Sequence, residues 1–266
     1  MKLPVTVIIL TKDEELHLAT CLESVKDWTD EILIVDSFSS DATEKIAAHY
    51  GAKFFQHPFE NQAQQFNWAL AELSVTNPWV LRLDADERMT RGLWEEIAIS
   101  LPRIKDNICG FLMKRRVYFM GRWIRHGGYY PAWFLRLFRY GLAKSEEREM
   151  DERIVLLEGR VQRLKNDFID ENKRDLRWWT EKHNQYADRE IQAIIRRPIS
   201  QKRNLDFYYR WPVFFRAFAY FFYRYFLRLG FLDGKEGLIF HFLQGCWYRF
   251  LVDAKLYEYH KNIKRK

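Results

Sequence analysis

The amino-acid sequence predicts an α/β fold, in which a mixed sheet is flanked by helices and followed by an aromatic helical segment. Two observations lead to this prediction. Short apolar runs alternate with helical stretches through the first half of the chain, and aromatic residues crowd into the last third. A regular alternation of strand and helix is typical of a parallel sheet covered by helices. The chain has 266 residues, which is enough for one large domain with a sizeable core.

The predicted strands of the first half are short apolar runs that end in polar or acidic residues. They cover residues 5–10, 31–36, 53–56 and 79–84. Helices are predicted between them, over residues 14–26, 42–50 and 62–73. Each strand is followed by a turn and a helix, so the strands are expected to run parallel.

The middle of the chain, residues 109–159, changes character. Strands with basic and aromatic interruptions are predicted over residues 111–119, 134–138 and 153–157. A loop between the first two is marked by Gly121, Gly127, Gly128 and Pro131. This pattern predicts an antiparallel edge that carries a loop over a site. A charged helix over residues 173–196 follows, and Pro198 ends it.

The composition limits the class of protein. The net charge is +7 and the pI is about 9.2, which suits phosphates, nucleic acid or an anionic bilayer and does not choose among them. The three cysteines, Cys21, Cys109 and Cys246, are widely separated. This spacing predicts neither a disulfide framework nor a zinc site, and a reducing cytoplasm is the expected compartment.

Polar and acidic clusters follow three of the predicted strands. They comprise residues 11–14, 36–41 and 84–87. Ligands of open parallel sheets bind beyond the carboxyl ends of the strands. The three clusters are therefore expected to line one edge of the sheet.

The pair Asp84 and Asp86 is the most informative of these clusters. One carboxylate can reach a divalent cation while the other meets a ribose or a water of the metal, and Mg²⁺ and Mn²⁺ prefer such oxygen ligands. The metal would neutralise charge on a leaving nucleoside diphosphate. The alternative is a solvated turn. The preceding apolar strand and the two earlier polar strand ends favour the metal site.

Three motifs, in order, resemble those of family 2 glycosyltransferases. They are residues 5–11 with Glu14 just beyond, residues 34–37 followed by 41–43, and the Asp-x-Asp of residues 83–87. The resemblance covers roughly the first ninety residues. It implies a GT-A (Rossmann-like) fold, a nucleotide-diphosphate sugar donor, of which a UDP-sugar is the expected form, and inverting, metal-dependent transfer of a hexose-type sugar.

The resemblance also implies roles for individual residues. Thr11 and Glu14 would border the nucleoside, and Asp36 would hydrogen-bond the base. Asp84 would contact ribose or metal, and Asp86 would ligate Mg²⁺ or Mn²⁺.

Four further residues have two interpretations each. Ser37 belongs to the nucleotide-sugar site by resemblance, or is a turn former. Asn67 lies on a helix where the family places an Asn near the donor, or is an exposed amide. Asp41 caps the following helix or contributes to the nucleotide motif, or does both. Arg136 is expected to grip the donor diphosphate or an anionic acceptor, because guanidinium forks match phosphate oxygens.

A narrower resemblance, to lipopolysaccharide-core glucosyl- and heptosyl-type enzymes, rests on residues 128–131, residues 135–139 and the pair Asp151-Glu152. Such enzymes often have His-Glu at that pair, and Asn where this chain has Asp13. Transfer to a hydroxyl needs a general base. Glu152 is the expected base, and Asp151 and then His126 are the alternatives. A charged strand start is the structural interpretation of the pair.

The last third of the chain predicts membrane association. If residues 205–229 form a helix, then Arg210, Arg216, Arg224 and Arg228 share one sector and aromatic residues occupy the rest. A basic stripe opposite an aromatic face is typical of a helix in the membrane interface, attracted to anionic lipids. The alternative is a helix packed in a core. A second aromatic stretch covers residues 238–259. The longest uncharged run has about eleven residues, so no transmembrane helix is predicted.

Together these observations predict a catalytic domain over residues 1–200, with a nucleotide-binding half (1–100) and an acceptor half (101–200). Residues 201–266 would form a membrane-association region. The expected location is the cytoplasmic face of the inner (plasma) membrane, as a peripheral or monotopic protein. The expected partners are a nucleotide-sugar donor, a lipid-linked or lipopolysaccharide glycan acceptor and the membrane surface. No nucleic-acid-binding signature is present. Two alternatives stay open: transfer to a polyprenyl phosphate, and a non-catalytic membrane-bound adaptor that retains the fold.

Overall fold

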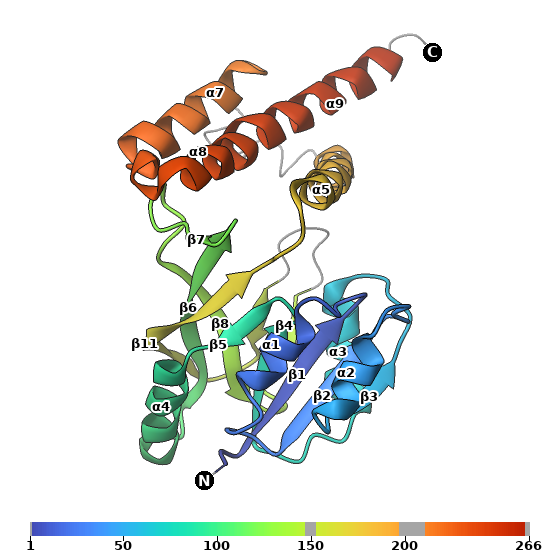
Figure 1. Cartoon of the computed structure of the whole chain (residues 1–266), viewed down its shortest axis with the longest axis vertical. Helices are drawn as coiled ribbons and strands as arrows, with labels where there is room; N and C mark the ends of the chain where they lie inside the picture. The colour runs from blue at the N-terminus through green and yellow to red at the C-terminus, as the bar shows by residue number, and fades with distance from the viewer. Residues whose placement is uncertain (1, 147–152, 197–210, 264–266) are drawn as a thin grey trace. The chain divides into compact units, whose positions relative to one another are not determined.

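The computed structural model describes residues 2–146, 153–196 and 211–263. The chain packs as two units (Figure 1). The first contains residues 1–118 and 131–172, and the second contains residues 119–130 and 173–266. The second unit therefore includes a segment from the middle of the chain. The predicted functional division at residue 200 stays a prediction.

The first unit is built on a mixed sheet. Eight strands of this sheet follow the order β3 (Lys53–Gln56), β2 (Glu31–Asp36), β1 (Val5–Thr11), β4 (Trp79–Asp84), β8 (Ala132–Arg139), β6 (Ile108–Phe119), β11 (Arg160–Glu171) and β5 (Glu87–Met89). The first four are parallel to one another, whereas β8 is antiparallel to both β4 and β6. The predicted mixed sheet with flanking helices is confirmed.

Both faces of the sheet are buried, and β1 shows how the sequence achieves this. Val5, Val7 and Ile9 point into one core, which α1 (Leu18–Glu23), α2 (Thr43–His49) and α4 (Arg91–Ser100) cover. Ile8 points into the opposite core, against α3 (Gln62–Glu72) and the hairpin of β9 (Ala143–Ser145) and β10 (Ile154–Leu156). Successive residues of a strand face opposite sides, so a strand covered on both sides is apolar throughout. Figure 1 shows α1 and α2 beside β1 and β2.

Most strands of the first half match their predicted ranges, and the elements that the pattern did not predict include α4, β5, β9, β11 and the short β7 (Arg122–Trp123), which lies in the predicted loop. Of these β11 is the most instructive, because its sequence is highly charged. Acidic residues of β11 form ion pairs with basic residues of the neighbouring β6. Asp167 Oδ1 lies 3.1 Å from Lys114 Nζ, and Asp170 Oδ2 lies 3.3 Å from Arg115 Nη1. Cross-strand ion pairs take the place of apolar alternation here.

The second unit is helical among its described residues apart from the 119–130 segment. Its helix α5 (Leu176–Arg196) packs against α9 (Tyr248–Ile263) through Ala187, Ile191, Tyr248 and Val252. Helix α7 (Phe215–Phe222) continues into a π-helical turn, Tyr223–Leu227, and α8 (Gly234–Phe242) continues through the π-helical turn Leu243–Trp247 into α9. No described helix is long and apolar enough to cross a membrane.

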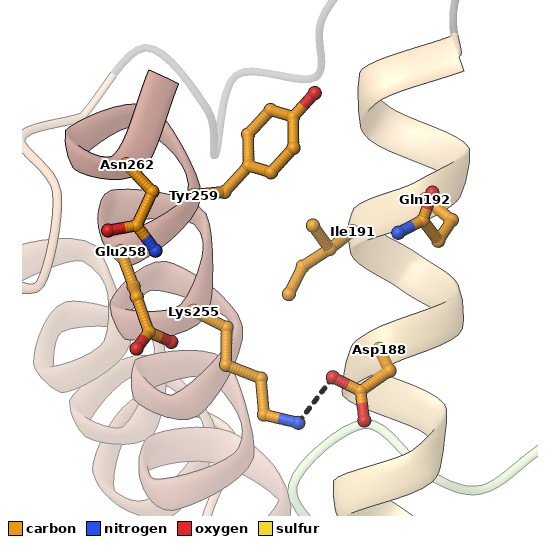
Figure 2. Close-up of a pocket in the computed structure, with 7 residues that line it drawn as sticks. All are labelled: Asp188, Ile191, Gln192, Lys255, Glu258, Tyr259 and Asn262. Atoms are coloured by element: carbon orange, nitrogen blue, oxygen red, sulfur yellow. Dashed lines mark hydrogen bonds and ion pairs between the residues drawn. The ribbon is translucent and has the colours of Figure 1, made fainter. Parts of the chain in front are cut away.

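A polar pocket opens between α5 and α9 near the end of both helices (Figure 2). Lys255 Nζ lies 2.5 Å from Asp188 Oδ1 across it. The lining residues are Asp188, Ile191, Gln192, Lys255, Glu258, Tyr259 and Asn262. None of the predicted site residues lies among them, so this pocket is not the site that the sequence motifs predict.

The predicted basic stripe opposite the aromatic face is wrong for its two middle arginines, Arg216 and Arg224, which bind partners inside the second unit. Arg216 is buried, and its Nε donates to both carboxylate oxygens of the buried Asp253 at 2.9 and 3.0 Å. Arg224 donates from Nε to the carbonyl oxygen of Gly127 at 2.6 Å. Arg210 lies outside the described residues, and Arg228 alone of the four is exposed among those described. Unpaired charge is costly to bury, so each inward arginine takes an internal partner.

The segment 124–130 is fastened to the helices by a compact polar contact. The buried carboxylate of Asp233 accepts the backbone N–H of His126 at 2.9 Å, and its other oxygen lies 2.6 Å from His126 Nδ1. The guanidinium of Arg224 lies 3.8 Å from the centre of the Tyr129 ring. Gly127 has a φ of +67°, and a Cβ there would collide with the His241 ring. Only glycine satisfies both demands.

We expect Gly127→Ala to destabilise the second unit far more than Gly121→Ala. Both glycines have positive φ, but a Cβ on Gly121 meets nothing within 4 Å. Backbone strain alone costs about 1–2 kcal/mol, and the collision with His241 adds about 1–3 kcal/mol of overpacking. The free energy of unfolding in urea measures both variants. Equal losses would contradict the tight contact between residue 127 and His241.

Candidate active site

The strand register brings the predicted motif residues to one edge of the sheet. Thr11 at the end of β1 pairs with Asp36 of β2, and the adjacent Leu10 pairs with Asp84 of β4. Thr11 Oγ1 donates a hydrogen bond to Asp36 Oδ1 at 2.8 Å. Because the three strands are parallel, their carboxyl ends form one rim, which is where ligands of such sheets bind.

Asp36 is fully buried, and the residues around it satisfy its carboxylate. Besides Thr11, it accepts the N–H of Ser39 at 2.7 Å and the Ser39 hydroxyl at 2.5 Å. The next residue, Ser37, accepts a hydrogen bond from Nε2 of Gln65 on α3 at 3.2 Å. A buried carboxylate is tolerated only with such donors, and here they hold Asp36 in one orientation.

Reciprocal hydrogen bonds tie the loop after β1 to the loop after β2. The N–H of Asp13 donates to Ser39 Oγ at 2.7 Å, and Asp13 Oδ1 accepts the N–H of Ser40 at 2.8 Å. The N–H of Glu14 donates to Thr43 Oγ1 at 2.9 Å. Asp13 has a φ of +52°, a conformation that Asn and Asp tolerate best. The predicted helix from residue 14 therefore begins only at Leu18, since residues 13 and 14 serve the loop contact.

The N-cap position of α2 is Ala42, and not Asp41 as one of the two interpretations of Asp41 predicted, but the Asp41 side chain still binds the first amide of the helix from one residue earlier. Its Oδ1 accepts the N–H of Thr43 at 2.9 Å, and its Oδ2 accepts the N–H of Glu15 at 3.0 Å. Satisfying the first amides of a helix stabilises it. The same side chain thus starts α2 and joins the two loops.

Asp84 lies between two arginines that the strands bury. Its Oδ1 is 3.4 Å from Arg82 Nη2, and its Oδ2 is 3.4 Å from Arg136 Nη2. Burial raises the pKa of the Asp84 carboxyl, but the two guanidinium groups outweigh burial and lower the pKa to about 2. Asp84 is therefore ionised at neutral pH. Its side chain is 28 % exposed, so a ligand can reach it.

Two neighbouring carboxyl groups have the opposite shift. Burial raises the pKa of Glu87 to about 8; Asp84 and Asp170 add to this, and the direct contact with Arg136 opposes it. Asp170 pairs with Glu87 across β11 and β5, and burial with the charge of Asp86 raises its pKa to about 6. The carboxyl groups are crowded enough to repel one another, and a cation at this edge would relieve that repulsion.

Asp86 is half-buried beside this cluster. Its Oδ2 accepts a hydrogen bond from Asn172 Nδ2 at 3.0 Å, and its carbonyl oxygen accepts the N–H of Glu171. Within the part of the chain that the structure describes, no group of three or more His, Cys, Asp or Glu side chains is arranged to hold a metal. Magnesium commonly takes one or two protein carboxylates, with phosphate and water completing its shell. Asp86 and Asp84 fit that smaller set.

Arg136 and Arg139 lie on opposite sides of β8, as the strand period predicts. Arg136 contacts Asp84 and Glu87, whereas Arg139 donates from Nε to the carbonyl oxygen of Ile108 at 3.2 Å. In the described residues, the buried Nε atoms of Arg82, Arg115 and Arg136 have no hydrogen-bond partner. The expected contact between Arg136 and phosphate stays a prediction.

Asn67 has backbone partners at both ends of its amide. Its Nδ2 donates to the carbonyl oxygen of Ser145 at 2.9 Å, and its Oδ1 accepts the Ser145 N–H at 2.8 Å. The amide thus fastens β9 to α3. Its predicted contact with the donor stays a prediction. Asp151 and Glu152, the predicted bases, lie outside the described residues, between β9 and β10.

Sequence reasoning missed several residues of this edge. Arg82 had a signal, because it interrupts an apolar strand, and Glu87 follows the Asp-x-Asp directly. Asp170 and Arg115 had none, since they come from the charged β11 and the distant β6. Phe38 is 52 % exposed with a φ of +60°, a strained conformation that often marks a functional loop.

Comparison with protein families identifies this arrangement. Residues 6–154 match the model of glycosyl transferase family 2. The chain belongs to glycosyl transferase family 2. The match covers β1 to the start of β10 and includes every predicted motif up to the pair Asp151-Glu152. The predicted family and the GT-A fold class are therefore confirmed.

This family 2 chain is also similar to individual proteins. It is 32 % identical over 170 residues to the lipopolysaccharide core biosynthesis glycosyltransferase LpsC of Rhizobium meliloti, which is 60 % of each chain. It is 35 % identical over 118 residues to the uncharacterized glycosyltransferase RT0209 of Rickettsia typhi, which is 44 % of this chain and 40 % of that one. The chain therefore spans less than two thirds of these relatives, and its likeness to lipopolysaccharide-core enzymes is confirmed.

Among solved structures, glucosyl-3-phosphoglycerate synthase of Mycobacterium tuberculosis, in complex with Mn²⁺, uridine diphosphate and glucosyl-3-phosphoglycerate, has a TM-score of 0.35 to this chain. It is 20 % identical, and the alignment covers 43 % of this chain and 44 % of that one.

We expect Arg136→Met to lower the free energy of unfolding of the first unit by about 3–5 kcal/mol at pH 8, because it leaves buried carboxylates without their cation. The loss shrinks at pH 5: without Arg136 the folded-state pKa values of Glu87 and Asp84 rise, and those groups bind protons as the pH falls. Arg139→Met is the control, since Arg139 Nε donates to a carbonyl oxygen. Amide exchange of β1 and β4 in urea measures both. A pH-independent loss would contradict the pairing.

Proposed function

We propose that this family 2 chain is an inverting, metal-dependent glycosyltransferase that moves a hexose-type sugar from a nucleotide-diphosphate sugar, a UDP-sugar, to a glycan acceptor. The observation that carries the proposal is the shared edge of Thr11, Asp36 and Asp84, at the carboxyl ends of three parallel strands. The family match over residues 6–154 supports the same reaction class.

The nucleoside is proposed to bind over the two interlaced loops. Asp36, with Thr11 and Ser37 beside it, is proposed to hydrogen-bond the base once the surrounding loop residues give way to it, and Glu14 and Asn67 are proposed to border the donor. Asp36 is already held by three donors, so its orientation costs little entropy when the nucleotide binds. Because hydrogen bonds between the two loops hold both in place, they present a preformed surface to the nucleotide sugar. Such a surface favours both the affinity for the donor and the precise placement of its sugar.

The diphosphate is proposed to lie toward Asp84 and Asp86. A Mg²⁺ or Mn²⁺ ion held by Asp86, with Asp84 near the metal or the ribose, would supply charge neutralisation for the departing diphosphate. Asp84 is ionised because Arg82 and Arg136 hold its pKa low, so its carboxylate can bind a metal ion or accept a hydrogen bond from the ribose. Arg136 contacts Asp84, so its guanidinium lies beside the proposed diphosphate position, which supports a role for it at the phosphates.

The transfer is a single displacement. The acceptor hydroxyl oxygen bonds to the anomeric carbon, while the bond from that carbon to the phosphate oxygen breaks and the nucleoside diphosphate leaves with the electron pair. The hydroxyl proton passes to a carboxylate, for which we propose Glu152, with Asp151 as the alternative. Attack opposite the leaving group inverts the anomeric configuration.

The acceptor is proposed to be a lipid-linked or lipopolysaccharide-core glycan at the cytoplasmic face of the inner membrane. The relative whose name includes lipopolysaccharide core biosynthesis supports this class of acceptor. A peripheral, monotopic attachment would bring the enzyme to such an acceptor.

Asp86→Ala is expected to abolish transfer, by at least about three orders of magnitude, because it removes the carboxylate that holds the metal. EDTA inhibits the parent enzyme, and Mn²⁺ restores it. Asp30→Ala is the control, since Asp30 is exposed at the opposite end of β2. Purified protein is assayed for sugar transfer and for binding of uridine diphosphate with and without Mn²⁺. Near-normal turnover of Asp86→Ala would refute the metal assignment.

Glu152→Gln preserves the shape of the side chain and removes its ability to accept a proton. We expect transfer to fall by roughly two to four orders of magnitude with donor binding retained. Single-turnover transfer and donor titration measure the two quantities.

The paired variant Asp151→Asn distinguishes the neighbours. A crippled Asp151→Asn beside an active Glu152→Gln would assign the base to Asp151. If both variants remain active, a base-free transfer to polyprenyl phosphate explains the result better. If no nucleotide sugar is hydrolysed or transferred by the parent protein, the non-catalytic adaptor is favoured.

A further inference from the structure

Helix α7 is amphipathic in the reverse sense for a protein in water. Its outward face carries Phe215, Phe218 and Phe222, each 54–55 % exposed, and the stripe continues in the π-helical turn with Phe226. Its inward face carries Arg216 and Ala217, which are buried. Helices of soluble domains place their apolar stripe toward the core.

The charged side chains on the inward face of α7 and its π-helical turn form ion pairs and hydrogen bonds within the second unit. Arg216 and Asp253 form a buried pair, and Asp253 Oδ2 also accepts the N–H of Phe214 at 2.9 Å. Arg224 holds the Gly127 carbonyl and donates to the Tyr220 hydroxyl at 2.5 Å. These contacts hold α7 in one rotation about its axis, so its phenylalanines have no route into the core.

The exposed apolar surface extends beyond α7. We name it the aromatic face, and it comprises Trp211, Val213, Phe215, Phe218, Phe222, Tyr223, Phe226, Leu227, Leu229, Phe231, Leu232, Leu238 and Phe242. In the described stretch 211–243, the exposed charged side chains are Arg228 and Lys235. Isolated exposed apolar residues are ordinary, whereas thirteen large exposed apolar side chains on or beside helical segments that pack against one another are typical of an interaction surface.

Positive charge accompanies this face. Arg122 and Arg125 are exposed on the 119–130 segment, which Asp233 and Arg224 fasten to the same helices. With Arg228 and Lys235, four exposed cations accompany the aromatic face. Exposed aromatic side chains together with exposed cations on one unit match the interface of an anionic bilayer, where rings sit among the acyl chains and cations meet the headgroups.

We propose that the aromatic face inserts into the lipid bilayer and holds the enzyme there mainly through apolar burial, with the four cations contributing a smaller, screened attraction. The partner is a phospholipid surface; a second copy of the chain, which carries the same exposed cations, would place like charges together. This inference deepens the proposed function, because it names the surface that would bring the enzyme to a lipid-linked acceptor. It also replaces the sequence-based prediction that a stripe of arginines on this helix meets the membrane, since Arg216 and Arg224 face inward.

The 119–130 segment gives the docking surface a consequence for the site. The chain leaves β6 at Phe119, passes through the second unit and returns to β8 at Ala132. Strand β8 carries Arg136. The segment that joins β6 to β8 along the chain therefore belongs to the unit that we propose to dock on the bilayer.

The test uses the full chain with two sets of vesicles, phosphatidylcholine alone and phosphatidylcholine mixed with phosphatidylglycerol, at low and high salt. Wild-type protein is expected to sediment with both sets of vesicles. High salt should weaken its binding to the anionic vesicles by no more than about tenfold, because salt screens the cations but does not affect the burial of the aromatic rings. The triple variant Phe218→Ser, Phe222→Ser, Leu227→Ser should bind about two to three orders of magnitude more weakly, about tenfold for each half-buried side chain lost.

The matched control is Phe59→Ser, Ile99→Ser, Leu157→Ser, which removes three similarly exposed side chains (48 %, 62 % and 57 %) from the first unit. It should bind vesicles like wild type. Donor hydrolysis without acceptor should be equal in all three proteins, so a failure of docking is separable from a failure of the glycosyltransferase proposal. Equal vesicle binding by the two triple variants overturns the proposal. So does a wild-type protein that ignores vesicles, including one that dimerises through this face in sedimentation velocity.

Discussion

The hydrogen-bond register of β1 with its two neighbours is the constraint on which the active edge depends. Val5, Val7, Ile8 and Ile9 are completely buried between cores on both faces, so a slip of one residue would turn every side chain to the wrong core. That register sets Thr11 beside Asp36 and Leu10 beside Asp84. The hydrophobic core therefore determines, at a distance, which polar atoms meet at the rim.

At this rim several acidic side chains are crowded together, and Arg82 also pairs with one of them, Asp84. Asp84, Glu87 and Asp170 lie close together, with Arg136 and Arg115 as their cations. The resulting pKa values diverge: one carboxyl is held ionised, and two are raised by burial and mutual repulsion. Neighbouring carboxyl groups whose pKa values differ this much are common at functional sites, where a substrate or cation completes the charge balance. A structural role alone would be served better by apolar packing.

The second unit solves the opposite problem, with charge placed inside and aromatic surface outside. The buried pair of Arg216 and Asp253 sets the rotation of α7, and Arg224 with Asp233 fastens the loop around Gly127. These are directional contacts, so they specify one arrangement where apolar packing of similar rings would allow several. The result is an exposed apolar surface, a feature that is typical of interaction sites.

The sequence by itself determined the strands of the nucleotide-binding half and the three motifs at their ends, because apolar runs with polar ends are local signals. It also determined the family, since those motifs occur in order. Only the tertiary structure decided which charges face one another. Asp170 and Arg115 join the site from β11 and β6, and no local pattern relates them to Asp84. The direction of Arg216 was decided in the same way: a helical wheel gives angles around an axis, but the partner that turns one side inward, Asp253, lies 37 residues away along the chain.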